Sequence, residues 1–149
     1  MLIDAVERVR IWNTKTGLQV GQLLKGHIYW GTSLAYSPDG QYVVSGSIDK
    51  TARIWKAETG SEVGYSLKGH NNAGTSVAYS PNGQYVMTGS KDKTVRVWNA
   101  QTGLLVDKLL RGPTHSVTSV VYSPYSQYVA FGSREHIVNI WHPQTGQQV

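Results

Sequence analysis

The chain has 149 residues, of which 40% are hydrophobic and 15% charged, with a net charge of +5 and no cysteine. This balance is typical of a folded globular protein, and no run approaches the roughly 18 apolar residues of a membrane-spanning helix. The lack of cysteine excludes disulfides and thiolate zinc sites, and the charged residues within positions 1–10 do not fit a signal peptide. We therefore expect a cytoplasmic protein without a membrane partner.

A tryptophan recurs every 43 residues, at Trp12, Trp55, Trp98 and Trp141. Other motifs recur around it in the same register: Gly26-His27 and Gly69-His70; Tyr36-Ser37-Pro38, Tyr79-Ser80-Pro81 and Tyr122-Ser123-Pro124; Gly46-Ser47, Gly89-Ser90 and Gly132-Ser133. A fixed period of this length indicates a repeat protein, in which one small unit is copied because it cannot bury its apolar surface alone.

The period divides the chain into one repeat array. We expect half a unit at residues 1–25, complete units at 26–68 and 69–111, and a unit at 112–149 that lacks most of its outer strand.

Each unit shows the two-residue alternation of strands and no helical pattern, which predicts an all-β fold. The strands of the first complete unit are expected at 32–37, 41–47, 51–56 and 62–67, and adding 43 or 86 gives those of the later units. Pro38-Asp39-Gly40 and Pro81-Asn82-Gly83 predict tight hairpin turns. In the third unit Pro124-Tyr125-Ser126 takes this place, so we expect a different or more strained turn there.

These motifs resemble the WD-repeat β-propeller family. The resemblance rests on the Gly-His pair, the Tyr-Ser-Pro-Asp-Gly turn, the Ser-Gly-Ser-x-Asp-Lys-Thr stretch and the x-Arg-Ile-Trp strand end, and it covers the whole chain. It implies a partial propeller of about three and a half four-stranded blades. The aspartate that usually follows the tryptophan is replaced by Asn13, Lys56, Asn99 and His142.

The resemblance also implies a hydrogen-bonded tetrad in each blade, which ties its strands together. The tetrads would be His27, Ser45, Asp49 and Trp55 in one unit and His70, Thr88, Asp92 and Trp98 in the next. The third unit has Pro113, Phe131 and Glu135 at three of these places and keeps only Trp141, so we expect packing to hold it instead.

No residue pattern predicts an enzyme or a cofactor site. The His-Asp pairs invite a catalytic interpretation, but Ser45 and Thr88 would be fixed inside a sheet rather than exposed as nucleophiles. His115, His136 and His142 lack metal-ligand spacing, and no phosphate-binding loop precedes a helix. We expect no catalytic residue, no metal and no cofactor.

Binding is expected where the units differ, because loops on a rigid frame carry specificity. The segments after the Gly-His position diverge, and in the family they share one face with the turns between the second and third strands. The candidates are Ile28, Tyr29 and Trp30; Asn71, Asn72 and Ala73; Thr114, His115 and Ser116; and Ile48, Lys91 and Arg134. Tyr29 and Trp30 suit an unidentified protein or peptide partner, unless Trp30 packs against a neighbouring blade.

Two other ligands stay open. The same aromatic pair suits a sugar ring, and the basic residues Lys91 and Arg134 near it suit a nucleic acid, although the charge is too scattered to favour one.

Three and a half blades cannot close a ring within one chain. The strand at 18–24, which contains Leu18, Val20, Leu23 and Leu24, matches the outer strand that the last unit lacks. We therefore expect a homo-oligomer, most simply a two-fold dimer in which each chain lends this strand to the other. The alternative is that the chain is a fragment of a larger signalling-protein propeller.

Overall fold

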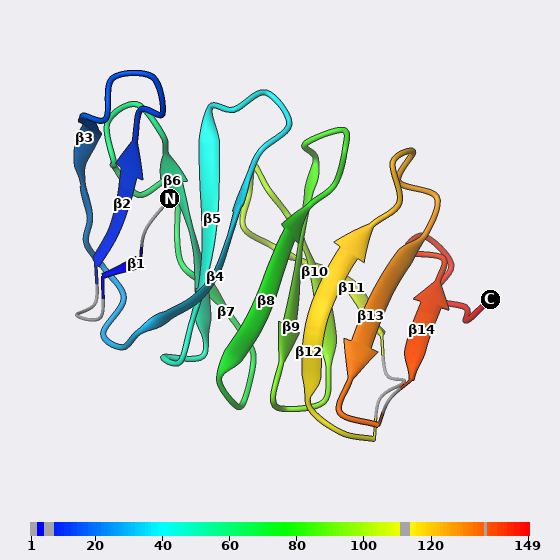
Figure 1. The fold of residues 1–149 in the computed structure, drawn as a ribbon. Coiled ribbons are helices and arrows are strands. Elements are labelled where there is room, and N and C mark those ends of the chain that lie inside the picture. The colour runs from blue at the N-terminus through cyan, green and yellow to red at the C-terminus, as the bar shows by residue number, and fades with distance from the viewer. Residues whose placement is uncertain (1–2, 5–7, 111–113, 136) are drawn as a thin grey trace.

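Four antiparallel sheets follow one another along the chain and stand side by side in an open row (Figure 1). The computed structural model describes residues 3–4, 8–110, 114–135 and 137–149. The strands are β1 Ile3–Asp4, β2 Arg8–Trp12, β3 Gln19–Leu24, β4 Gly31–Tyr36, β5 Tyr42–Ser47, β6 Thr51–Lys56, β7 Leu67–Lys68, β8 Gly74–Tyr79, β9 Tyr85–Ser90, β10 Val95–Asn99, β11 Leu105–Leu110, β12 Val117–Tyr122, β13 Val129–Ser133 and β14 Val138–Trp141. These ranges contain no helix that is long and apolar enough to cross a membrane. The all-β partial propeller that the sequence predicts is confirmed.

Each sheet is a meander of consecutive strands. The orders are β1-β2-β3, β4-β5-β6-β7, β8-β9-β10-β11 and β12-β13-β14. The register repeats with the sequence, because a valine of the second strand pairs each time with the recurring tryptophan: Val43 with Trp55, Val86 with Trp98 and Val129 with Trp141. Since a slip of one residue would exchange the two faces of a strand, this register places equivalent side chains on the same face of every sheet.

Two outer elements differ from the predicted ones. The strand predicted at 62–67 is reduced to β7, preceded by a single bridge between Glu62 and Trp55. Gly64 adopts a left-handed φ of 68° and Tyr65 is 90% exposed, so the chain leaves the sheet edge there. The first sheet also contains β1, which extends the predicted half-unit by a short strand paired with β2.

The three hairpin turns between the first and second strands of a blade share one form. Gly40 and Gly83 have φ values of 70° and 73°, and Ser126 at the equivalent position has a φ of 56°. Each donates its N–H to the carbonyl of the serine three residues earlier, as Ser126 does to Ser123 at 3.0 Å. The third turn is therefore strained rather than different, because a residue with a Cβ occupies the left-handed region.

Apolar side chains fill the space between successive sheets. Between the second and third sheets the buried cluster consists of Val44, Ala52, Ile54, Leu67, Val77, Val86 and Trp98. Hydrogen bonds also cross between sheets: Ser33 Oγ accepts from the Val77 N–H and Ser76 Oγ from the Val120 N–H, both at 3.2 Å, and Thr32 Oγ1–H donates to the Gly74 carbonyl at 2.8 Å. The sheets are thus held in register by burial and by polar contacts.

The outer face of the last sheet carries repeat positions that are buried between sheets in the earlier units, but no described strand packs against this face. Ile54 and Val97 are each 4% exposed, whereas Ile140 at the equivalent position is 44% exposed. Likewise Val95 is 0% exposed and its counterpart Val138 is 70% exposed. We call the outward-facing residues Ser119, Val121, Ala130, Val138 and Ile140 the end face. Its composition is that of an interface between sheets.

Candidate functional site

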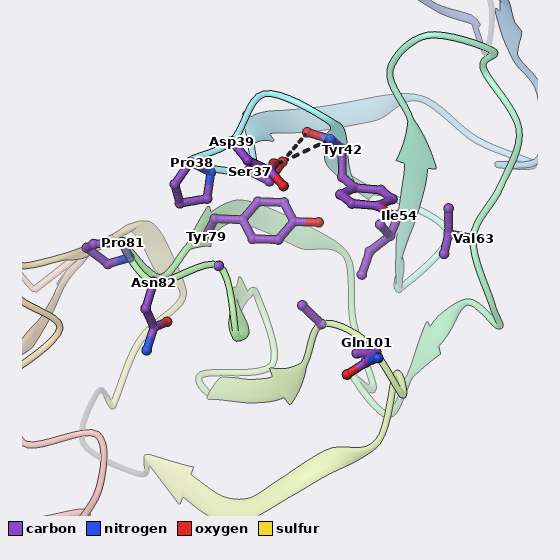
Figure 2. Close-up of a pocket in the computed structure, with 12 residues that line it drawn as sticks. Ser37, Pro38, Asp39, Tyr42, Ile54, Val63, Tyr79, Pro81, Asn82 and Gln101 are labelled. Atoms are coloured by element: carbon purple, nitrogen blue, oxygen red, sulfur yellow. Dashed lines mark hydrogen bonds between the residues drawn. The ribbon is translucent and has the colours of Figure 1, made fainter.

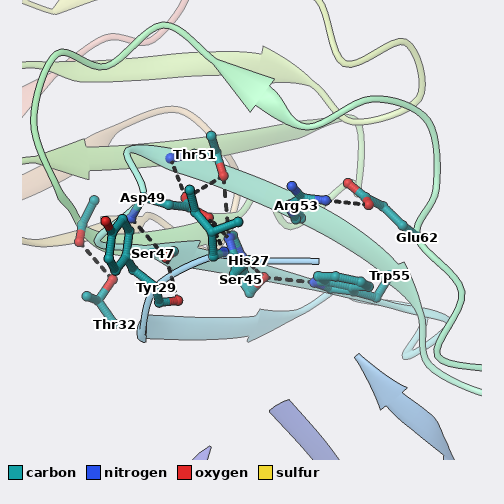
Figure 3. A network of polar contacts seen from close by, with 12 residues as sticks. His27, Tyr29, Thr32, Ser45, Ser47, Asp49, Thr51, Arg53, Trp55 and Glu62 are labelled. Atoms are coloured by element: carbon teal, nitrogen blue, oxygen red, sulfur yellow. Dashed lines mark hydrogen bonds and ion pairs between the residues drawn. The ribbon is translucent and has the colours of Figure 1, made fainter. Parts of the chain in front are cut away.

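A chain of hydrogen bonds joins four residues of the second sheet and its flanking loop (Figure 3). His27 contacts Asp49 Oδ2 through Nδ1 at 2.8 Å and Ser45 Oγ through Nε2 at 2.7 Å. The indole Nε1–H of Trp55 donates to the same Ser45 oxygen at 2.8 Å. The structure therefore brings together the four residues that the family resemblance implies, and it ties the loop before β4 to β5 and β6.

A fifth residue, Thr51, completes this network. Its side-chain hydroxyl and its backbone N–H donate to Asp49 Oδ1 at 2.6 and 2.9 Å. A carboxylate only accepts, so His27 carries its proton on Nδ1 and accepts at Nε2 from the Ser45 hydroxyl. The sequence analysis missed Thr51, although the recurring Asp-Lys-Thr stretch contains it.

The protonation states in this network follow from burial and hydrogen bonding. Burial lowers the pKa of His27 by more than the Asp49 carboxylate raises it, which favours a neutral imidazole. Burial alone would raise the pKa of Asp49, but hydrogen bonds from Thr51 and His27 outweigh it and hold the pKa below its ordinary value. The network is therefore an ionised carboxylate joined to four neutral groups.

The third sheet contains a second copy of the network. His70 contacts Asp92 at 2.8 Å and Thr88 at 2.7 Å, and Trp98 donates to Thr88 at 2.9 Å. Burial raises the pKa of Asp92, but hydrogen bonds from His70 and Thr94 reverse the shift and leave the pKa well below its ordinary value.

Ser45, His27 and Asp49 are hydrogen-bonded in the order of a hydrolase triad, but a substrate cannot reach the serine hydroxyl. Ser45 is 0% exposed, and its oxygen already accepts the Trp55 indole proton. A nucleophile must reach a substrate carbonyl, and this hydroxyl lies inside a sheet. The geometry fits a structural role.

The last sheet is held differently. Trp141 Nε1 is buried without a hydrogen-bond partner among the described residues, and its ring stacks on Phe131 with centroids 6.2 Å apart. Glu135 accepts from Thr114 and contacts His115 Nδ1 at 2.6 Å. The predicted substitution at Pro113 lies outside the described residues. The sequence analysis placed His115 in a binding loop and missed its contact with Glu135.

The candidate binding loops are fixed by one recurring backbone contact. The N–H of Ile48, Lys91 and Arg134 donates to the carbonyl of Trp30, Ala73 and Ser116 respectively, at 2.9 to 3.2 Å. Each loop therefore lies beside the turn that follows the second strand, as expected from the sequence. The same backbone hydrogen bond therefore holds all three loops, although their side chains differ.

Most of the loop side chains point outward. Ile28, Tyr29 and Trp30 are 67%, 57% and 62% exposed, so Trp30 does not pack into a neighbouring sheet. Asn71, Asn72, Thr114, His115, Lys91 and Arg134 are exposed as well. We call Ile28, Tyr29, Trp30 and Ile48 the aromatic loop patch, because the other loops carry no aromatic residue.

Comparison with known protein families agrees with this geometry. The family model for the WD domain, G-beta repeat, matches residues 18–56, 61–99 and 105–142, which is more than half of the chain. The chain belongs to the WD40 family. WD40 repeats generally form non-catalytic scaffolds for protein interactions. A search of curated proteins found no significant match.

The strand that is predicted to pass to a second copy of this WD40 chain pairs with β2 of its own chain in the structure. β3, with Val20, Leu23 and Leu24, is the edge strand of its own first sheet, and Leu18 precedes it at 68% exposure. Leu24 is 2% exposed and packs with Val43 and Trp55 of the same chain. Lending this strand alone is therefore disfavoured, because it would break both its pairing with β2 and this cluster.

No group of three or more His, Cys, Asp or Glu side chains in the described ranges of this WD40 chain is placed to hold a metal ion.

Proposed function

We propose that this chain is a non-catalytic scaffold that binds a protein or peptide through the aromatic loop patch. The observation that carries the proposal is the exposure of Tyr29 and Trp30 on a loop whose backbone is fixed. Ser47 Oγ–H donates to the Tyr29 carbonyl at 3.0 Å, and the Ile48 N–H donates to the Trp30 carbonyl at 3.0 Å.

Such an arrangement suits recognition for a physical reason. Exposed tryptophan and tyrosine bury large areas on binding and carry most of the energy of many interfaces. A loop that is already ordered loses little further conformational entropy when a partner binds. The aromatic loop patch thus combines a large apolar area with a preorganised backbone.

The test is an affinity capture with the immobilised protein and its Trp30→Ala variant. We expect the variant to lose its bound proteins, by a factor of about 30 or more in affinity if Trp30 is an anchor. Tyr65→Ala is the matched control, because Tyr65 is 90% exposed and lies outside the patch. Equal capture by all three proteins would contradict the proposal, and capture that nuclease or sugar abolishes would favour the alternative ligands.

We further propose that a second copy covers the end face. Inside the chain, Ile54 packs in one cluster with Trp98 of the next sheet. Trp12 of the first sheet is the repeat equivalent of Trp98, and it is 37% exposed. The end face of one copy and the Trp12 face of another therefore carry matching halves of the interface that this repeat already forms between its own sheets.

Solution mass tests this assembly. We expect sedimentation equilibrium to give a multiple of the 16.4 kDa chain mass, and Val138→Lys to reduce it to one chain. A folded protein with the mass of one chain at all concentrations would contradict self-assembly without affecting the binding proposal.

A further inference from the structure

A groove crosses the ends of the strands opposite the aromatic loop patch. It consists of four adjoining pockets of about 370, 380, 270 and 490 Å³, and Asn82 lines all four. Gly83 and Gln101 are shared by the first two pockets, and Ser126 and Gln144 by the last two. The groove therefore runs continuously from the second sheet across the third to the last.

Two of these pockets are repeat copies of each other. The apolar wall of the first is formed by Tyr42, Ile54, Val63 and Tyr79. The wall of the second is formed by the residues 43 positions later, Tyr85, Val97, Val106 and Tyr122. The same apolar pocket thus recurs at successive sheet interfaces, which suits one extended chain that inserts side chains at intervals.

The groove has a negative charge at one end. Asp39 lines the first pocket, and none of the described residues that line the four pockets is a lysine or arginine, although the chain carries a net charge of +5. Asp39 Oδ1 accepts from Ser37 Oγ–H at 2.5 Å and from the Gln41 N–H at 3.0 Å, while Oδ2 accepts no hydrogen bond from the part of the chain that the structure describes. The hydrogen bond from Ser37 holds the pKa of Asp39 below its ordinary value, so the carboxylate is ionised and has a free oxygen.

Tyrosines lie at the floor of both pockets. Figure 2 shows Tyr79 lying across the first pocket between Pro38 and Ile54. In the second pocket Tyr122 is 8% exposed, and its hydroxyl is buried without a partner among the described residues. Because this hydroxyl is buried, Tyr122 presents its ring rather than its hydroxyl to the pocket.

We propose that this groove binds an extended peptide in which a lysine or arginine stands near apolar residues. The basic side chain lays its stem on Tyr42 and Tyr79 and its charge against Asp39 Oδ2. An apolar side chain of the same peptide fills the second pocket against Tyr85, Val97 and Tyr122. This site does not depend on the aromatic loop patch, because the turn after β4 and the loop before it lie at opposite ends of that strand.

The test selects short random peptides from a displayed library on the immobilised full chain. We expect enriched sequences to combine a basic residue with apolar ones. Their affinity should fall roughly fivefold in Asp39→Asn, which removes one partly exposed ion pair, and stay unchanged in Trp30→Ala. Asp39→Asn is a mild change, because Asn82 makes the equivalent turn bonds with Ser80 and Gln84 in the next unit.

Tyr122→Phe keeps the apolar wall of the second pocket and removes only the buried hydroxyl. We expect this variant to raise the melting temperature and to leave the affinity of the selected peptides unchanged. No enrichment, enriched peptides without a basic residue, or affinities that Asp39→Asn leaves unchanged would each overturn the proposal. Peptides lost in Trp30→Ala but kept in Asp39→Asn would overturn it too, while supporting the loop patch.

Discussion

Ser45 occupies the centre of the network in the second sheet, since it accepts from Trp55 and donates to His27. Ser45→Ala leaves two buried polar groups without a partner, which should lower the free energy of unfolding by about 2–4 kcal/mol. Thr88→Ser in the third sheet keeps the hydroxyl and loses only a methyl group, so it should cost about 1 kcal/mol. Urea denaturation measures both, and equal losses would show that the hydroxyl itself contributes nothing.

The ionisable residues of the networks predict how stability depends on pH. The unfolded chain protonates His27 at its ordinary pKa of 6.5, above the pKa in the fold, so stability falls as the pH drops below this value. Asp49 and Asp92 stabilise the fold above their ordinary pKa of 3.8, and this contribution is lost as the pH falls through their lower folded values. Denaturation at a series of pH values checks the trend. A gain in stability from about pH 7 to about pH 5 would contradict the neutral His27.

Ser126 has a left-handed backbone conformation, as do Lys50 and Lys93 among the described residues other than glycine. Glycine occupies the same turn position at Gly40 and Gly83. Ser126→Gly should therefore raise the free energy of unfolding by about 1 kcal/mol, because it removes the left-handed strain. The reverse change, Gly83→Ser, is the matched control and should destabilise by a similar amount in the same thermal melt. A Ser126→Gly variant that melts lower than the wild type would show that the turn is not strained.

At the scale of the element, the last sheet relies on packing where the others have networks. Phe131 is 1% exposed and stacks on Trp141, so Phe131→Thr should lose about 3 kcal/mol of packing and regain about 1 kcal/mol from a hydrogen bond to the indole. We therefore expect a net loss of stability, although the other two networks have a hydroxyl residue at this position. Hydrogen exchange should also be faster in β12–β14 than in β8–β11. A stabilised variant would show that the missing network matters more than the aromatic pair.

At the scale of the whole molecule, one repeat position has opposite environments in the middle and at the end of the row. Ile54→Lys buries a charge between sheets and should cost about 4 kcal/mol or more, since Ile54 is 4% exposed. Ile140→Lys lies on the end face and should change the stability of one chain by less than about 0.5 kcal/mol, while weakening assembly. Chemical denaturation and sedimentation of the two variants measure these effects. Unfolding of the Ile140→Lys chain would mean that the end face is already part of an internal core.

Particular residues show which parts of the fold the sequence predicts and which it does not. The Pro-Asp-Gly and Pro-Asn-Gly turns and the alternation around each tryptophan predict the hairpins and strands, because these signals are local. The shortened β7 depends on the left-handed conformation of Gly64, which has no unique local signal. The contact between His115 and Glu135 joins two loops far apart in the sequence, so only the fold reveals it.

By itself, the sequence determined the repeat and the strands, since a fixed period with turn chemistry leaves few ways to form antiparallel sheets, and its resemblance to the WD-repeat family implied four of the five residues in each network. Only the tertiary structure decided which copies of a position are buried, which aromatic side chains face solvent and that four pockets join at Asn82. The reason is that burial and grooves depend on how neighbouring sheets stack. Identical sequence positions acquire different surroundings at the middle and the end of the row.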